Sequence, residues 1–280
     1  MVKIYRIGVG YVGGPTMAVI TLTLQEYGKV CASMAFGIGV AYKEGVGKAS
    51  LFLLGLDDVV KQCRGKNLFF STDVERHAAE ADIIFVSVNN QTKTRGLGAG
   101  KAADFTYWES ATRMIAEVSM SDKIVVEKST VPVKTTKAIE KILTHNSKGI
   151  KYQIISNPKF LAEGNAIKDL LNTDRVLIGG RETPEGKKAI EALTNMYGQW
   201  VPKDRILVTN LWSGELSKLA ANAFFAQKIS YVNAMLALCE ATGSNVSQLA
   251  HNVRTDSRNG PKLLDASIAF SRFLLPKGHT

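Results

Sequence analysis

The chain of 280 residues contains little cysteine and no long apolar run. Its three cysteines, Cys31, Cys63 and Cys239, lie far apart and lack the spacing of a metal or redox site, so we interpret them as reduced structural thiols. No apolar run reaches the roughly 20 residues that a membrane-spanning helix needs. The first residues also lack a small-residue cleavage site, and we therefore expect a cytoplasmic protein with no membrane partner.

A dense basic tract is missing too, although the formal net charge is +10. The lysines and arginines are scattered, and no aromatic-rich surface for reading bases accompanies them. We therefore expect no nucleic-acid partner. The excess positive charge is interpreted as a solvated surface that attracts anionic phosphates.

Short apolar runs alternate with amphipathic stretches over the first two hundred residues, which is typical of an α/β, Rossmann-like doubly wound sheet. The predicted strands are Lys3–Val9, Asn67–Ser71, Asp82–Val88, Lys123–Glu127, Tyr152–Ser156 and Arg175–Ile178. The predicted helices are Thr16–Leu24, Thr106–Val118, Val133–His145 and Pro184–Tyr197.

After residue 210 the sequence becomes helical, with a long proline-free run that ends at Gly243. The helices expected here are Ser213–Thr242, Val246–Val253 and Lys262–Phe270. We therefore predict a sheet domain over residues 1–210 and a helical segment over residues 211–280. Three helices make a poor core of their own, so the apolar side of the long helix is expected to pack against a partner subunit.

A glycine-rich turn follows the first predicted strand and opens the first helix. Gly8, Gly10 and Gly13 give the pattern G-x-G-x-x-G, with Tyr11 and Val12 between the last two glycines. The first glycine permits the turn, the second lets backbone approach a pyrophosphate, and the third allows close helix–strand packing. This context favours a dinucleotide such as NAD; the alternative is a tight strand–helix turn without a ligand.

An acidic residue that should hold the ribose is absent from the end of the second strand. Residues 29–37 contain no carboxylate, and the next acid is Glu44. A hydrogen bond to a charged partner contributes about 1.5–3 kcal/mol, so we predict NAD binding about ten- to a hundredfold weaker than with that acid.

Two further strand exits lie at the edge of the sheet where dinucleotides bind. Val88 and Asn89 end one strand, and Ser129 and Thr130 follow another. We predict that these four residues contact the cofactor. The alternative is an ordinary strand-to-loop exit in each case.

Longer motifs carry a resemblance to a known family. They are Ser156–Gly164 (SNPKFLAEG), Gly65–Thr72 (GKNLFFST), Asp174–Gly180 (DRVLIGG) and Glu215–Phe224 (ELSKLAANAF). Together with the glycine turn they resemble the UDP-glucose 6-dehydrogenase family. The resemblance implies oxidation of UDP-glucose to UDP-glucuronate with two molecules of NAD, through a cysteine thioester that water hydrolyses.

The resemblance also implies roles for individual residues. Lys218 and Asn222 match the pair that binds the reacting oxygen, and they stand one helical turn apart on one face. Thr130 matches the threonine that holds the catalytic water. The remaining implied contacts are Glu163 near the nicotinamide, and Phe160, Leu161 and Arg258 with the sugar nucleotide.

Three positions depart from the family's chemistry. Lys159 stands where the family has its water-activating glutamate, Leu274 where it has the nucleophilic cysteine, and Gly278 where it has an aspartate. The family's second α/β domain, which holds most UDP contacts, is not found in the sequence. We therefore expect a family member that does not complete the oxidation.

Three readings remain open at this stage. One is a working UDP-glucose dehydrogenase. Another is a non-catalytic subunit that pairs, as a homo-oligomer or with a full-length family partner, through the long helix. The last is a one-step alcohol dehydrogenase that uses Lys218 and Asn222 without a thiol.

Overall fold

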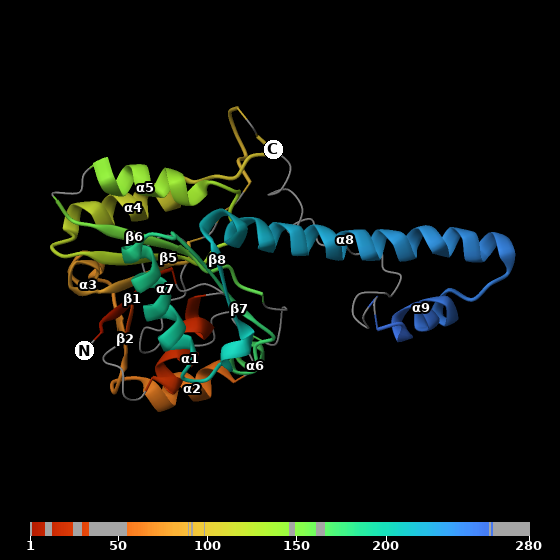
Figure 1. The fold of residues 1–280 in the computed structure, drawn as a ribbon, viewed down its shortest axis with the longest axis horizontal. Coiled ribbons are helices and arrows are strands. Elements are labelled where there is room, and N and C mark those ends of the chain that lie inside the picture. Colours follow the sequence, from red (N-terminus) through yellow and green to blue (C-terminus); the bar gives the residue numbers. More distant parts are fainter. Residues whose placement is uncertain are drawn as a thin grey trace.

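The computed structural model describes most of the chain, and the elements are drawn in Figure 1. The described residues are 2–8, 13–24, 30–33, 55–88, 90, 92–97, 99–145, 149–160, 166–257 and 259. The sheet strands are β1 (Ile4–Ile7), β2 (Val30–Ser33), β3 (Leu68–Ser71), β4 (Ile83–Val86), β5 (Lys123–Glu127), β6 (Tyr152–Ser156), β7 (Val176–Gly180) and β8 (Ile206–Asn210). The helices are α1 (Gly13–Thr23), α2 (Leu56–Cys63), α3 (Val74–Glu80), α4 (Thr106–Val118), α5 (Thr135–His145), α6 (Ala166–Leu171), α7 (Pro184–Tyr197), α8 (Leu211–Thr242) and α9 (Val246–Thr255), with a short 3₁₀ turn at Lys203–Arg205.

The strands form one eight-stranded sheet in the order β3-β2-β1-β4-β5-β6-β7-β8. The first six strands in this order run parallel, and β7 pairs antiparallel with β6 before β8 continues parallel to β7. The chain thus winds outward from β1 in two directions. This confirms the predicted α/β, Rossmann-like class.

Helices cover both faces of the sheet and bury its alternating side chains in two cores (Figure 1). One core contains α1, α2, α6 and α7, packed on residues such as Phe85 and Ile155. The other contains α3, α4 and α5, packed on the opposite faces of the same strands through residues such as Ile84 and Ile154. Neighbouring residues of a strand thus enter different cores, as the pleat requires.

Every strand predicted from the sequence has a counterpart, within two residues at each described end. Helix α1 begins three residues before the predicted start at Thr16, because Pro15 is well placed in a first helical turn. The elements β2, β8, α2, α3 and α6 have no counterpart among the predicted ranges, although the second strand was expected within residues 29–37. The predicted helix Lys262–Phe270 lies outside the described residues.

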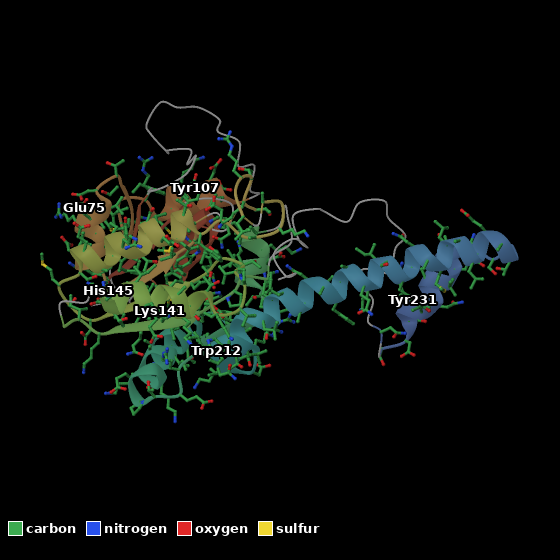
Figure 2. The ribbon with its side chains drawn as sticks, turned by 90° about the horizontal axis from the view of Figure 1, so that it is seen from above. Glu75, Tyr107, Lys141, His145, Trp212 and Tyr231 are labelled. Carbon is green, nitrogen blue, oxygen red and sulfur yellow. The ribbon has the colours of Figure 1, made fainter. Side chains whose placement is uncertain are left out.

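Helix α8 links the sheet to the helical segment. Asn210 caps its start by accepting a hydrogen bond from the Ser213 amide, and Gly243 ends it in the left-handed conformation. Its first turns contact β6 and β7, and the rest of the helix projects away from the sheet (Figure 1). Figure 2 places Trp212 at the sheet end of the helix and Tyr231 far along it, beside α9.

A glycine pair sets the close approach of α8 to the sheet. A β-carbon on Gly214 would lie 3.1 Å from the Gly179 Cα atom, and one on Gly179 would lie 3.2 Å from the Gly214 Cα atom. Both values are tighter than ordinary contacts. The helix therefore rests directly on the backbone of β7.

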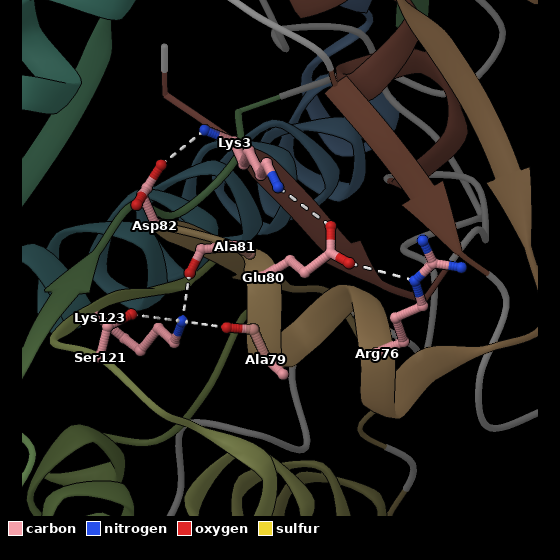
Figure 3. Close-up of polar contacts among 8 residues, drawn as sticks. All are labelled: Lys3, Arg76, Ala79, Glu80, Ala81, Asp82, Ser121 and Lys123. Atoms are coloured by element: carbon pink, nitrogen blue, oxygen red, sulfur yellow. Dashed lines mark hydrogen bonds and ion pairs between the residues drawn. The ribbon is translucent and has the colours of Figure 1, made fainter.

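The amino ends of the strands are fastened by charged groups (Figure 3). Buried Lys123 donates from Nζ to the carbonyl oxygens of Ala79 (2.7 Å) and Ala81 (2.6 Å), at the end of α3. The Lys3 amide donates to Asp82, and the Lys3 ammonium pairs with Glu80. These contacts hold β1, α3 and β5 together at the edge opposite the predicted cofactor exits.

Candidate active site

The glycine turn at the end of β1 has no room for side chains. Gly8 has a φ of 94°, and a β-carbon there would lie 2.5 Å from the Ser87 carbonyl oxygen at the exit of β4. A β-carbon on Gly13 would lie 2.2 Å from the Gly8 carbonyl oxygen. Backbone approach at both positions is what a dinucleotide turn requires.

Three of the predicted cofactor residues in the turn, Gly10, Tyr11 and Val12, lie outside the described residues. Of residues 29–37, where the ribose acid was sought, only β2 (Val30–Ser33) is described, and it contains no acid. The cofactor role assigned to these residues stays a prediction.

The parallel strands β1, β4, β5 and β6 all end at this edge, and the sheet order reverses between β1 and β4. Ser129 Oγ donates to the Val88 carbonyl oxygen (2.9 Å). Asn90 Nδ2 donates to the Thr130 carbonyl oxygen (3.3 Å). The structure thus brings Val88, Ser129 and Thr130 together beside Gly8, while Asn89 lies outside the described residues.

Asn90 is buried at this edge and was not predicted from the sequence. Its signal was its position directly after a strand exit, one residue beyond Asn89. Its contact with Thr130 could not be predicted from the sequence, because the two residues are 40 positions apart.

The start of α8 supplies the candidate substrate groups. Lys218 Nζ lies 5.0 Å from the centroid of the Phe160 ring, and the Arg175 guanidinium lies 4.3 Å from the same centroid. Burial, reinforced by the charge of Arg175, lowers the pKa of Lys218. Asn222, one turn further along α8, is buried.

The predicted grouping of Phe160 and Lys218 is therefore present. The other candidate contacts, Leu161, Glu163 and Arg258, lie outside the described residues, as do Leu274 and Gly278.

A buried network that the sequence did not predict lies beneath Phe160. Lys128 Nζ donates to Asn157 Oδ1 (2.6 Å) and to the Tyr197 hydroxyl oxygen (2.9 Å). The Tyr197 hydroxyl also donates to Asn157 Oδ1 (2.6 Å), and Asn157 Nδ2 donates to the Leu177 carbonyl oxygen (2.6 Å). Burial, the Arg6 charge and, in the opposite sense, Glu127 bring the Lys128 pKa to about 7.

Lys159 is buried next to this network, with 8% of its surface exposed. Burial is the main reason that its pKa falls to about 6, and the charges of Arg6, Lys128 and Lys218 act in the same direction against a smaller opposite effect of Asp169. Arg6, in β1, is itself fully buried, and burial lowers its pKa to about 9. Basic side chains with lowered pKa values therefore occupy the place where the resemblance puts a carboxylate.

Glu215, in α8, fixes the loop that leaves β5. Its carboxylate oxygens accept hydrogen bonds from the amides of Lys134 (2.6 Å) and Thr136 (2.8 Å) at the start of α5. Burial raises the pKa of Glu215. This carboxylate couples the start of α8 to the loop that carries Ser129 and Thr130.

The described residues contain no group of three or more metal-ligating side chains. Within the same residues, no helix is both long and apolar enough to cross a membrane. Cys63 and Cys239 are buried free thiols, in agreement with the structural role predicted for them.

Comparisons with known proteins agree with this geometry. Residues 2–201 match the NAD binding domain of the UDP-glucose/GDP-mannose dehydrogenase family, and residues 212–278 match the central domain of that family.

Among curated proteins, the chain is 70% identical over 270 residues to UDP-glucose 6-dehydrogenase 1 of Glycine max, and 68% identical to UDP-glucose 6-dehydrogenase 2 of Arabidopsis thaliana. Each match covers 96% of this chain and 56% of the relative, so the chain spans just over half the length of these relatives. A UDP-glucose dehydrogenase structure from Pyrobaculum islandicum superposes with a TM-score of 0.80 at 26% identity, over 96% of this chain and 60% of that one.

Proposed function

The chain belongs to the UDP-glucose/GDP-mannose dehydrogenase family, and on that premise we propose that it binds NAD at the glycine turn without completing the oxidation of UDP-glucose to UDP-glucuronate. Residues 2–201 match the NAD binding domain of that family. The cytoplasmic location remains a prediction.

The described residues fit a dinucleotide. Gly8 and Gly13 leave the backbone free of side chains at the turn, and Val88, Ser129 and Thr130 line the neighbouring exits. When bound, NAD accepts a hydride from an alcohol or a bound aldehyde. The basic surroundings of this edge suit the negative pyrophosphate.

The observation that carries the proposal is the buried position of Lys159 among cations. Activation of water requires a group that accepts a proton. With a pKa of about 6, Lys159 is largely neutral at pH 7, and accepting a proton from water would add a buried charge beside Arg6 and Lys128, whereas a carboxylate becomes neutral when it accepts the proton. Leu274, at the position of the family's cysteine, removes in addition the thiol that would carry the acyl group.

The test is an assay of the purified chain with UDP-glucose and NAD. We expect calorimetry to detect NAD binding, weaker than in relatives with the ribose acid, and chromatography to detect no UDP-glucuronate. Formation of UDP-glucuronate by the chain alone would overturn the proposal. A folded sample without measurable NAD binding would overturn its first half.

A one-step alcohol oxidation is the second candidate, and the environment of Lys218 favours it. The lowered pKa of Lys218 makes its neutral amine more available as a proton acceptor, and the buried Asn222 amide lies on the same helical face. In this case the product is the aldehyde. Lys218→Met should abolish NADH formation, whereas Lys228→Met, ten residues further along α8, should not.

We also propose that α8 associates with a second copy or with a longer family member. Its exposed surface carries large apolar side chains: Trp212, Leu216, Phe224, Phe225, Tyr231 and Leu238. A row of this size on one helix is unusual for an unpartnered surface.

UDP-glucose as the sugar nucleotide stays a proposal based on the relatives.

A further inference from the structure

A small cavity lies at the carboxyl edge of the sheet, beneath Phe160. It is enclosed by the loop after β6, the start of β7 and the ends of α6 and α7, and its volume is about 30 Å³. Lys128, Lys159 and Arg175 line it together with the aromatic side chains of Tyr197 and Trp200. Its wall is therefore basic, with Lys128 and Lys159 buried and Arg175 exposed at its rim.

The charge around this cavity is unbalanced. Arg6 acts on Lys128 and Lys159, and Lys218 adds to the effect on Lys159. Among the described residues, the carboxylates that counter them are Asp169 for Lys159 and Glu127 for Lys128.

Arg6 has more hydrogen-bond donors than the acceptors around it satisfy. Its Nε donates to the Gly8 carbonyl oxygen (3.1 Å). Its two terminal nitrogens are buried and have no hydrogen-bond partner among the described residues. A buried guanidinium of this kind is expected to be paired.

We propose that this cavity is a binding site for one small monovalent anion, of the size of chloride or bromide. Arg175 on the cavity wall and Arg6 and Lys218 near it supply positive charge, and an anion would offset the repulsion that opposes protonation of Lys128 and Lys159. The volume is close to that of a single water molecule, which excludes a phosphate or a nucleotide.

Binding is coupled to protons. An anion favours the protonated form of Lys159 and Lys128, so its affinity rises as pH falls from about 8 to 6. The groups that face Lys159 are Arg6 from β1, Lys128 after β5, Asp169 from α6 and Lys218 from α8. The proposal does not depend on NAD binding or on sugar oxidation.

The test is the thermal midpoint of the purified chain at pH 6.5 in increasing sodium bromide, against sodium gluconate of equal ionic strength. Gluconate is too large for the cavity and controls for screening. We expect a saturable rise with bromide of about 3 °C at ten times the dissociation constant. Equal shifts in the two salts would overturn the proposal.

Two variants that each remove one positive charge test whether the bromide-specific rise in the thermal midpoint comes from this cavity. Lys159→Gln should lose the bromide-specific rise, while Lys187→Gln, at an exposed position of α7, should keep it. Retention of the full rise in Lys159→Gln would contradict the assignment.

A bromide soak tests the site without any variant. We expect an anomalous scattering peak within the cavity, in contact with Lys159 and Arg175. A cavity without such a peak, in a crystal soaked at a bromide concentration that saturates the thermal shift, would overturn the proposal.

Discussion

At the scale of single residues, the buried lysines make stability depend on pH. The pKa values of Lys159 and Lys128 fall from 10.5 to about 6 and about 7 in the folded protein. Between about pH 7 and 10 the unfolded chain therefore holds protons that the folded protein does not. Unfolding takes up protons in this range, so stability rises with pH, by about 1.4 kcal/mol per pH unit for each lysine.

Urea unfolding between pH 7 and 9.5, in gluconate buffer without halide, measures this slope. Lys159→Gln removes one of the two lysines and should lower the slope by about half. It should also raise stability at pH 7, because Lys159 is protonated in the unfolded chain at this pH and must release its proton on folding, a cost that the substitution removes. An unchanged slope in Lys159→Gln would show that Lys159 does not titrate as described.

Gly13 is the residue where one added methyl group has the largest effect on the candidate cofactor site. In Gly13→Ala the new β-carbon would lie 2.2 Å from the Gly8 carbonyl oxygen, so α1 must shift away from β1. We expect a loss of about 1–3 kcal/mol in urea unfolding and at least a tenfold loss of NAD affinity.

Gly65→Ala is the matched control, since no atom lies within 4 Å of its β-carbon. Its φ of 76° adds only local backbone strain of about 1 kcal/mol. NAD affinity should therefore be unchanged in this control. Similar NAD affinities in the two variants would contradict the steric role of Gly13.

At the scale of elements, Glu215 joins two helices that are distant in sequence. Glu215→Ala leaves the amides of Lys134 and Thr136 without their acceptor, which should cost about 1–3 kcal/mol. Hydrogen exchange should quicken at these two amides first. Glu240→Ala, at an exposed position of the same helix, is the control and should leave both amides protected.

The long elements could be predicted from the sequence because their periods are long enough to be recognised. The bounds predicted for α4 and α7 are those observed. Helices α2, α3 and α6 span only 8, 7 and 6 residues, too few for a clear 3.6-residue period. β8 was missed because it is an edge strand whose Leu207 and Val208 are exposed.

Some residues of the candidate site could likewise be predicted from the sequence and others could not. Lys218, Phe160 and the glycine turn lie within continuous motifs, so local sequence indicates them. Arg6 and Tyr197 meet the network only through packing across the sheet, and no local pattern pairs them. A charged residue two positions before Gly8 in a buried strand was the available signal for Arg6.

At the scale of the whole molecule, the projecting part of α8 predicts association. Phe224 and Leu238 are 55% and 56% exposed on a helix that leaves the sheet behind (Figures 1 and 2). Sedimentation equilibrium of the purified chain should show an oligomer at micromolar concentration. Phe224→Ser combined with Leu238→Ser should weaken association at least tenfold, because apolar burial is lost.

A substitution of similar size on the sheet domain provides the control. Met120→Ser removes a side chain that is 86% exposed outside α8, and association should be unaffected. A monomer at all concentrations, with α8 folded, would contradict the proposed association.

The glycine contact between α8 and β7 has a mechanical consequence. Because Gly179 and Gly214 have no side chains, none interlock at this contact, and the first turn of the helix packs directly on the strand backbone. The helix extends about 42 Å from Gly214 to Thr242. A rotation of the helix by about 5° about the glycine contact would therefore displace Thr242 by about 4 Å. A displacement of about 1 Å at Lys218, one turn after Gly214, would thus become a displacement several times larger at the far end of α8.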